Sequence, residues 1–498
     1  MNLAAYFLDA NLPARRDKVA LRYREASFTF GEMHARSCRF GSHLRALGVR
    51  EEDRVLLALD DTPAFADAWF GVVRVGAVVA MMNPGVPTKD WAYYLRYTRA
   101  RVLVTTAAYA EANAELIREA LGRQLSAVIQ VDADAAAIDA RSADCPYGDT
   151  GPDDPAVWLF SSGSTGAPKA CVHVAQDFIF NTEMYAKQVL GIRESDITLG
   201  VPKLFFGYAT GTNLLFPWAV GATACLFSER TTVETIVANI EVFRPTIVTN
   251  VPTMIHLLLD HPRICELDLS SIRLVLSAGE ALPAELYTRW VARTGVEILD
   301  GIGSAEMFHI YITNYPGSVR TGTLGKLVPG YEAKILGDDE LPVPSGEIGT
   351  LWVKGPSNAI WYHQDRQKSR VTFRGEWTTT GDQFRQDEDG YFIYCGRADD
   401  LLKVGGVYVS PAEVENCLLT HPDVSECAIV GVEQDGLMTT VAFVVATAPG
   451  SPTLARVLQE HVKQRLAPHK YPRHVRFLDV LPRNDRGKVA RAELKRLV

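Results

Sequence analysis

Between about residue 150 and residue 300, short runs of apolar and β-branched residues alternate with longer amphipathic segments. The short runs predict buried strands at 157–160, 197–201, 222–227, 246–251, 272–277 and 296–300. The longer segments have a helical period, for example at 232–243 and 283–294. This alternation is typical of β-α-β units and predicts mostly parallel sheets flanked by helices.

The same style recurs at residues 50–105, where GVVRVGAVVAMMNPG predicts a helix, a strand and a turn. In sheets of parallel strands, ligands bind beyond the carboxyl ends of the strands. Polar residues that directly follow a predicted strand are therefore the first candidates for a functional site.

The pattern changes after about residue 320, where apolar and polar positions alternate between turn signals and predict antiparallel strands. A small, charged break follows at 396–400, and beyond it the strand and helix patterns predict a compact α+β unit. We therefore predict an α/β protein with a large N-terminal domain at 1–396, which includes a small β subdomain. A hinge at 397–400 would join it to a small, mobile C-terminal domain at 401–498.

The composition is that of a globular protein, with 47% hydrophobic and 22% charged residues. A length of 498 residues exceeds one ordinary domain, so two or three are expected. The net charge is −8 and no basic block is present, which argues against nucleic acid as a partner.

Cysteine usage and apolar runs indicate where the protein works. The eight cysteines form no C-x-x-C pair, which favours a reducing compartment over a zinc site or a disulfide scaffold. The first residues lack a basic segment before an apolar core, so we predict no signal peptide. The longest uncharged apolar run, 214–227, is too short to span a bilayer. We expect a cytoplasmic protein with no membrane contact.

The segment FSSGSTGAPKA at 160–170 follows a predicted strand and combines small hydroxyl residues, glycines and one lysine. Backbone N–H groups, hydroxyls and a cation in such a loop can surround a polyphosphate. Pro168 stands where the P-loop pattern G-x-x-x-x-G-K-[ST] needs its second glycine, so this would be a phosphate loop of another kind. On its own, a Ser/Gly run is more often a flexible surface turn.

A second candidate segment is DGIGSAEMFHIY at 300–311, which also follows a predicted strand. Gly301 and Gly303 would let a flat ligand approach the backbone, and the Glu306 carboxylate could hold Mg²⁺ on a phosphate. The residues after G-x-G do not match the dinucleotide loop G-x-G-x-x-G. Taken alone, Glu306 is more often a solvated or capping carboxylate.

Two further candidates lie toward the C-terminus. Asp382, after Thr380 and Gly381, could accept hydrogen bonds from a ribose diol, and Arg397 could add a charge-assisted bond. Lys488 lies on a polar loop, LPRNDRGKVAR, where a lone lysine usually only decorates the surface. None of these segments is decisive alone.

Their order along the chain is specific. The segments are FSSGSTGAPKA (160–170), GIGSAE (301–306), TGD (380–382), GRADDLLK (396–403) and PRNDRGK (482–488). This series resembles the motifs of the acyl-adenylate-forming superfamily, which includes acyl- and aryl-CoA ligases, adenylation domains of peptide synthetases, and luciferases. Two segments, VPKLFFGYATGTN (201–213) and DGIGSAEMFHIY, look most like benzoate–CoA ligases and their hydroxy- and aminobenzoate relatives.

The resemblance implies two half-reactions and the substrates ATP and coenzyme A, with Mg²⁺. A carboxylate attacks the α-phosphate of ATP to give an acyl-adenylate and pyrophosphate, and the CoA thiol then displaces AMP. The first step brings two anions together, so a cation must neutralise charge in the transition state. The substrate would be a small aromatic carboxylic acid, and a homodimer is left open.

The resemblance also implies roles for individual residues. The implied catalytic residues are Lys488, Lys403, Glu306 and Thr165, with Glu306 as the metal ligand. The implied nucleotide- and CoA-binding residues are Ser161, Ser162, Gly163, Ser164, Thr165, Gly166, Lys169, Ser277, Ala278, Gly279, Glu280, Asp300, Gly301, Ile302, Gly303, Ser304, Asp382, Arg397, Gly405 and Gly406. The implied acyl-pocket residues are Phe205, Phe206, Gly207, Tyr208, Gly303, His309 and Ile310.

Within these sets, the Ser/Gly loop would cradle the β- and γ-phosphates, and Lys488 would bridge the carboxylate and the α-phosphate. The segments 277–281 and 300–302 would sandwich the adenine, while Asp382 and Arg397 would hold the ribose. The small domain would then rotate about Asp399, because Lys488 must leave the site before the thiol enters. Asp399 could instead be an ordinary turn or capping residue.

The acyl pocket predicted from the aromatic run 205–208 is short and closed, which suits an aryl acid better than a fatty acid. On its own, such a run is more often core. Gly207 would leave space for a ring substituent, so the substrate would be benzoate or an ortho-substituted benzoate such as 2-aminobenzoate. His309 could either contact a substituent or pack as a core histidine.

One residue departs from the family pattern. The family loop usually ends Pro-Lys-Gly, whereas this chain has Ala170 after Lys169. If that position needs a positive φ, alanine costs about 1 kcal/mol there, but no donor is lost and activity should survive.

Two alternatives remain. A stand-alone adenylation enzyme would load a carrier-protein thiol by the same chemistry. A non-catalytic scaffold of the same fold would be expected to lack Lys488, Glu306 or Asp382, all of which are present.

Overall fold

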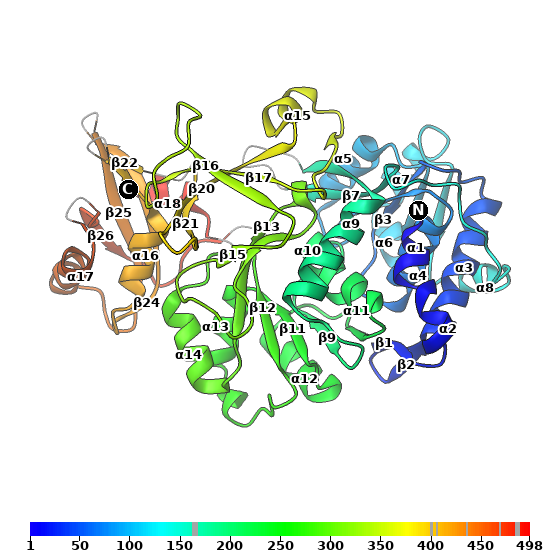
Figure 1. The fold of residues 1–498 in the computed structure, drawn as a ribbon, viewed down its shortest axis with the longest axis horizontal. Coiled ribbons are helices and arrows are strands. Elements are labelled where there is room, and N and C mark those ends of the chain that lie inside the picture. Colours follow the sequence, from blue (N-terminus) through cyan, green and yellow to red (C-terminus); the bar gives the residue numbers. More distant parts are fainter. Residues whose placement is uncertain (162–167, 399–401, 405–406, 435–436, 468–469, 484–488) are drawn as a thin grey trace.

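The computed structural model describes residues 1–161, 168–398, 402–404, 407–434, 437–467, 470–483 and 489–498. The fold contains two large sheets, a smaller β subdomain and a C-terminal α+β unit (Figure 1), and the two large sheets interleave along the chain. Within these described ranges, no helix is long and apolar enough to cross a membrane.

The first large sheet has seven strands in the order β18-β8-β7-β4-β3-β5-β6. Their bounds are β3 Arg54–Leu57, β4 Val78–Met81, β5 Val102–Thr105, β6 Ala127–Gln130, β7 Pro155–Ser161, β8 Lys169–Val174 and β18 Trp361–Tyr362. Strands β7, β4, β3, β5 and β6 are parallel, and β8 and β18 extend the sheet in antiparallel pairs.

The second large sheet has nine strands in the order β15-β14-β13-β12-β11-β9-β10-β1-β2. Their bounds are β1 Val19–Tyr23, β2 Ala26–Thr29, β9 Ile197–Gly200, β10 Thr223–Leu226, β11 Ile247–Asn250, β12 Leu274–Ser277, β13 Ile298–Gly303, β14 Ile310–Thr313 and β15 Lys326–Leu327. The middle strands are parallel, and antiparallel strands close both edges.

The central strands of both sheets are buried on both faces, so their alternate residues enter different cores. In β3, Val55 and Leu57 face the main core, whereas Leu56 joins the core under the outer helices. The main core lies between the sheets and is filled by α3 (Phe30–Ala46), α4 (Pro63–Arg74) and α9 (Ala175–Asn181). The outer faces are covered by α5 (Thr88–Thr98), α12 (Val233–Phe243), α13 (Pro252–Asp260) and α14 (Ala284–Thr294).

The rest of the chain forms two smaller units. The β subdomain contains β16 Glu332–Leu336, β17 Gly349–Lys354, β19 Phe373–Arg374, β20 Trp377–Gln386 and β21 Phe392–Arg397. The C-terminal unit contains β22 Leu402–Val404, β23 Val407–Val409, α16 Pro411–Leu419, β24 Val424–Gln434, β25 Leu437–Ala446, α17 Pro452–Arg465 and β26 His474–Phe477. It lies at the opposite end of the molecule from the N-terminus (Figure 1) and has its own apolar core.

The fold class predicted from the sequence is confirmed, and the helices at 233–243 and 284–294 begin within one residue of the prediction. One difference concerns connectivity. The predicted strand 157–160 belongs to the seven-stranded sheet, whereas the strands from 197 to 300 belong to the other. The strand at 155–161 is followed by an antiparallel strand and not by a crossover helix, so the chain leaves the first sheet there. The domain boundaries stay a prediction.

A buried ion pair holds the amino-terminal edge of the nine-stranded sheet, remote from the strand ends where ligands bind. Arg273 donates to both oxygens of Asp196 at 2.8 and 2.7 Å, and Thr246 donates to the same carboxylate at 2.7 Å. These residues directly precede β12, β9 and β11, so one carboxylate ties three neighbouring strands together. Burial alone would raise the pKa of Asp196, but these hydrogen bonds outweigh it and hold the pKa below its usual value.

We predict that Asp196→Ala lowers the free energy of unfolding by about 2–3 kcal/mol, because Arg273 loses its buried counter-ion. Since the pKa of Asp196 is depressed, the difference between wild type and variant should shrink below about pH 4, where this carboxylate becomes protonated. Urea unfolding at several pH values measures both effects. Asp268→Ala is the matched control: it breaks the exposed Arg244–Asp268 pair nearby and should cause no measurable change. Equal effects of the two variants would contradict the prediction.

Candidate active site

The predicted phosphate loop joins two strands of the first sheet. Ser161 ends β7 and pairs with Lys169 at the start of β8, so the loop is the tip of a hairpin. Nζ of Lys169 lies 3.2 Å from Oδ2 of Asp365, and the Tyr93 hydroxyl donates to the Pro168 carbonyl at 2.6 Å. The predicted donors Ser162, Gly163, Ser164, Thr165 and Gly166 lie outside the described residues.

Glu306 lies in a 3₁₀ turn, Ala305–Met307, between β13 and β14. Its Oε1 accepts a hydrogen bond from the Tyr362 hydroxyl at 2.7 Å. Its backbone carbonyl accepts from the N–H of Ala359 at 2.8 Å. On the other side, Nε2 of the buried His173 donates to the Ala305 carbonyl at 2.6 Å, while its Nδ1 is 2.7 Å from Asp177. The turn is thus fixed by contacts from two separate segments, residues 359–362 and the strand that contains His173.

Asp382 and Arg397 lie opposite each other on β20 and β21, and Nη1 of Arg397 is 3.0 Å from Oδ1 of Asp382. Arg397 is half-exposed, whereas Asp382 is almost buried. Arg397 interacts electrostatically with Glu306, and the buried Tyr311 interacts with all three charges. The structure therefore brings Glu306, Asp382 and Arg397 into one polar cluster, although they come from different strands.

The region assigned to adenine lies where β12 and β13 end. Ser277 and Asp300 are neighbours in the parallel register, and the Ser277 hydroxyl donates to Asp300 at 2.8 Å. Burial raises the pKa of Asp300 to about 7. Gly279 has a φ of +87° with open space around its Cβ position. Glu280 instead turns to α13, because its carboxylate accepts from the N–H and hydroxyl of Thr253.

The glycines of the second motif have a packing role within the fold, and the approach of a flat ligand to them stays a prediction. A Cβ on Gly301 would lie 2.8 Å from the Ile312 carbonyl oxygen, and one on Gly303 would lie 2.5 Å from that of His309. The close approach that these glycines allow is therefore to the backbone of β14, with which β13 pairs. Ile302 and Ser304 lie half-buried on the same segment.

His309 is the centre of the predicted acyl pocket. It is buried among the rings of Tyr185, Tyr208, Phe216 and Phe308. Its Nε2 donates to the Tyr208 carbonyl at 3.0 Å, and burial lowers its pKa to about 3. The ring is therefore neutral with its proton on Nε2, which leaves Nδ1 as a buried acceptor.

The other predicted pocket residues are placed unequally. Ile310 is buried beside His309, and Phe205 packs against the main core. Phe206 is 46% exposed, so the pocket is not closed at this ring. A Cβ on Gly207 would lie 3.1 Å from Leu159, so the space expected there is already filled by a leucine.

Several buried polar atoms around this site have no hydrogen-bond partner among the described residues. They are Ser304 Oγ, His309 Nδ1, Tyr208 Oη and Tyr311 Oη. A buried polar atom left unpaired costs about 1–3 kcal/mol, so a cluster of them is expected where a polar ligand completes the bonding. The residues present thus fit a nucleotide and an aromatic acid.

The residues also fit a magnesium ion held mainly by substrate oxygens. Over the described part of the chain, no group of three or more His, Cys, Asp or Glu residues could hold a metal alone. Mg²⁺ is commonly bound by one or two carboxylates together with phosphate oxygens and water, and Glu306 can supply such a carboxylate.

Several predicted residues cannot be placed. Asp399, Gly405, Gly406 and Lys488 lie outside the described residues, and of Lys403 only the backbone, in β22, is described.

Sequence reasoning missed the residues that support the site. Tyr362 and His173 contact the Glu306 turn, and a Cβ on Gly211 would lie 2.5 Å from the His309 ring. The signals available in the sequence were His173, in the apolar run after the phosphate loop, and Gly211 in the segment YATGTN. Tyr362 gave none, because it is 56 residues from Glu306 in the chain.

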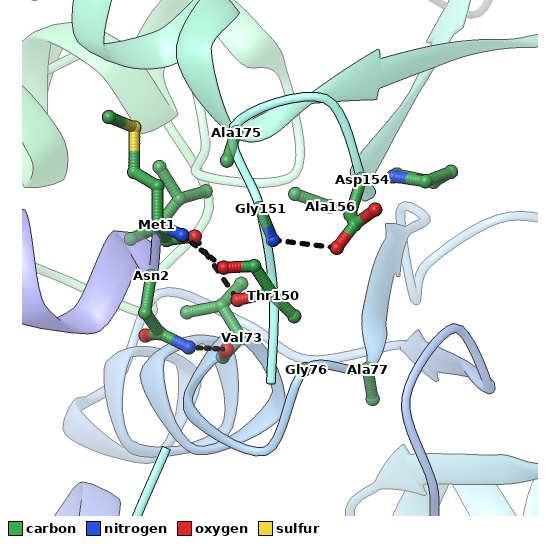
Figure 2. Close-up of a pocket in the computed structure, with 12 residues that line it drawn as sticks. Met1, Asn2, Val73, Gly76, Ala77, Thr150, Gly151, Asp154, Ala156 and Ala175 are labelled. Carbon is green, nitrogen blue, oxygen red and sulfur yellow. Dashed lines mark hydrogen bonds between the residues drawn. The ribbon is translucent and has the colours of Figure 1, made fainter. Parts of the chain in front are cut away.

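A small hollow near the N-terminus is unrelated to this site (Figure 2). It is lined by Met1, Asn2, Val73 and Thr150 among others, and has a volume of about 10 Å³. The Asn2 side chain donates to the Val73 carbonyl at 2.7 Å across it. Such a volume holds about one water molecule, and no predicted site residue lines it.

Comparisons with known proteins agree with the geometry. A protein of known structure, the anthranilate CoA ligase AuaEII in complex with anthranoyl-AMP, is 38% identical with a TM-score of 0.94, covering 100% of this chain and 97% of that one. A benzoate CoA ligase from Burkholderia xenovorans LB400 is 42% identical with a TM-score of 0.91, covering 99% and 100%. In sequence, the benzoate–CoA ligase of Thauera aromatica is 40% identical over 99% of this chain and 95% of its own length.

Two family models cover most of the chain. The model described as AMP-binding enzyme matches residues 8–363, and the AMP-binding enzyme C-terminal domain matches residues 413–488. The chain therefore belongs to the family of AMP-binding enzymes.

Proposed function

We propose that this chain is an ATP-dependent, AMP-forming aryl-CoA ligase, which adenylates benzoate or a ring-substituted benzoate and transfers the aryl group to coenzyme A. The observation that carries the proposal is that Glu306, which forms a polar cluster with Asp382 and Arg397, lies three residues before His309, which is buried among aromatic rings. Full-length similarity to benzoate and anthranilate CoA ligases supports it.

In the first half-reaction, an oxygen of the aryl carboxylate forms a bond to the α-phosphorus of ATP, and pyrophosphate leaves. Glu306 would hold Mg²⁺, which would neutralise phosphate charge. Asp382 and Arg397 orient the ribose, with the Asp382 carboxylate as the acceptor and Arg397 as its charged partner. The loop at 161–169 binds the departing phosphates, and Lys488 neutralises the two approaching anions.

In the second half-reaction, the CoA sulfur attacks the carbonyl carbon of the aryl-adenylate and AMP leaves. We assign the domains to 1–396 and 401–498 with a hinge at 397–400. Rotation about Asp399 removes Lys488 and brings in the face with Lys403, Gly405 and Gly406. The short β22–β23 hairpin that carries Lys403 is a separate two-stranded unit, which suits a surface that docks as a whole.

The pocket favours an aryl acid that carries an ortho hydrogen-bond donor. His309 is neutral and presents Nδ1 as a buried acceptor that no described residue satisfies. The amino group of 2-aminobenzoate could donate to it, whereas benzoate would leave it unpaired. We therefore propose 2-aminobenzoate as the preferred acid. A cytoplasmic location and a homodimer stay predictions, and a carrier-protein thiol is the alternative acceptor.

The overall reaction is tested by incubating the protein with ATP, Mg²⁺, CoA and a panel of benzoates. We expect AMP and the aryl-CoA thioester in equal amounts, which chromatography measures. A medium-chain fatty acid serves as the control and should give neither product. If none of the aryl acids gives AMP, the proposal is contradicted. Thioester formed only on an added carrier protein would favour the alternative.

Lys488→Ala separates the half-reactions. Adenylation, followed as pyrophosphate release, should fall roughly a hundredfold, because a cation is lost from the transition state. Conversion of a supplied aryl-adenylate to the thioester should be unchanged. Lys495→Ala, a nearby charge deletion, should alter neither step. Equal losses in both half-reactions of Lys488→Ala would show that this lysine has another role.

The substrate preference tests His309. We expect kcat/KM for 2-aminobenzoate to exceed that for benzoate by roughly tenfold or more, because benzoate leaves a buried acceptor unpaired. In His309→Leu this ratio should fall toward one. Since the pKa of His309 is lowered to about 3, the wild-type ratio should stay constant between about pH 6 and pH 8. A kcat/KM ratio that changes across about pH 6 to 8, where an ordinary histidine ionises, would contradict this assignment.

A further inference from the structure

The Glu306 carboxylate lies against two paired residues of the first sheet. Cys171 on β8 and Tyr362 on β18 are directly opposite in the antiparallel register. Residues opposite each other in such a pair project from the same face of the sheet. The Tyr362 hydroxyl donates to Oε1 of Glu306 at 2.7 Å, and the Cys171 thiol interacts with the same carboxylate.

Tyr362 is held so that its hydroxyl has little freedom. It is 4% exposed, its ring packs on Phe373, and its backbone N–H donates to the Ser369 hydroxyl at 3.0 Å. Burial, reinforced by the charge of Glu306, raises the pKa of Tyr362, so the phenol keeps its proton and remains a donor.

The backbone of the Glu306 turn is fixed independently of this bond. His173 and Ala359 bind the carbonyls of Ala305 and Glu306, and Ser357 donates to the Met307 carbonyl at 2.9 Å. Phe308 adopts a φ of +66°, which is unusual for a residue with a side chain and completes a tight turn. These contacts set the position of the Cα atom but leave the side-chain torsions of Glu306 free.

We propose that Tyr362 is a positioning residue for Glu306. By donating to Oε1, it selects one orientation of the carboxylate, which would then face the metal that accompanies the triphosphate. Strand β8, with which Tyr362 pairs at Cys171, begins at Lys169, so Tyr362 also links the end of the phosphate-loop segment to the Glu306 carboxylate. This inference rests on the proposed function, in which Glu306 holds Mg²⁺.

Tyr362→Phe removes one oxygen and keeps the ring. We expect the Mg²⁺ concentration that gives half-maximal pyrophosphate release to rise about tenfold, because a hydrogen bond to a charged group is lost. The dissociation constant of ATP with Mg²⁺, measured by calorimetry without aryl acid, should rise by a similar factor. ATP binding in EDTA and the KM for the aryl acid should not change.

Tyr97→Phe is the matched control. The Tyr97 hydroxyl donates to the His363 carbonyl at 2.6 Å and accepts from the Ala170 N–H at 3.2 Å, so it contacts the same two chain segments without touching Glu306. This variant should keep the wild-type Mg²⁺ dependence. If Tyr97→Phe and Tyr362→Phe raise the Mg²⁺ requirement equally, with equal losses in the melting temperature, Tyr362 is only structural and the inference is overturned.

Glu306→Gln separates the role of Glu306 in holding the metal from the role of Tyr362 in positioning Glu306. If Tyr362 acts through Glu306, the double variant should behave like Glu306→Gln alone in Mg²⁺ titrations. Additive effects would overturn the inference. If Glu306→Gln has an altered Mg²⁺ dependence and Tyr362→Phe has the wild-type one, the inference about Tyr362 is overturned and the proposed function stands. A Glu306→Gln variant with normal Mg²⁺ dependence would overturn both the inference and the metal assignment on which it rests.

Discussion

The site depends on one constraint, which is that the central strands of both large sheets are buried on both faces. Residues such as Val55, Leu56 and Leu57 fill these strands, and a polar side chain inside them is small and paired, as Thr198 is with Asn213. Charged groups such as Asp300 lie instead near the strand ends. Ser277 and Asp300 lie at two such ends, one strand apart. The burial that stabilises the sheets thus also concentrates the chemistry at one edge.

As a consequence, the edge of the sheets where the site lies contains buried polar atoms that form no hydrogen bond within the described structure. Ser304, Tyr208, His309 and Tyr311 each bury an atom without a partner in the described structure. Such atoms destabilise the ligand-free fold, and a ligand that supplies the missing donors or acceptors recovers this free energy. The neutral state of His309 follows from the same burial, because a charged imidazole among four aromatic rings would be strongly disfavoured.

Precision in the site comes from contacts between segments that are far apart in the chain. Glu306 is held by Tyr362 from a strand pair of the other sheet and by a turn that His173 and Ala359 support. Neither sheet could orient this carboxylate alone. In the proposed reaction the Glu306 carboxylate would act on a metal and phosphates, whose interaction energies vary steeply with distance, so support from several directions would matter for catalysis.

Sequence patterns were enough to predict the fold class, most element positions and the candidate residues Glu306, Asp382 and Arg397. They suffice there because the hydrophobic period is local and because motif residues follow strand ends in a set order. Other features appear only in the folded structure: residues 155–161 and 197–200 belong to different sheets, Gly301 allows the approach of β14, and Leu159 fills the space beside Gly207. The folded structure also revealed Tyr362. These facts depend on which distant segments pack together. A contact between side chains that are 56 or more residues apart leaves no periodic pattern in the sequence.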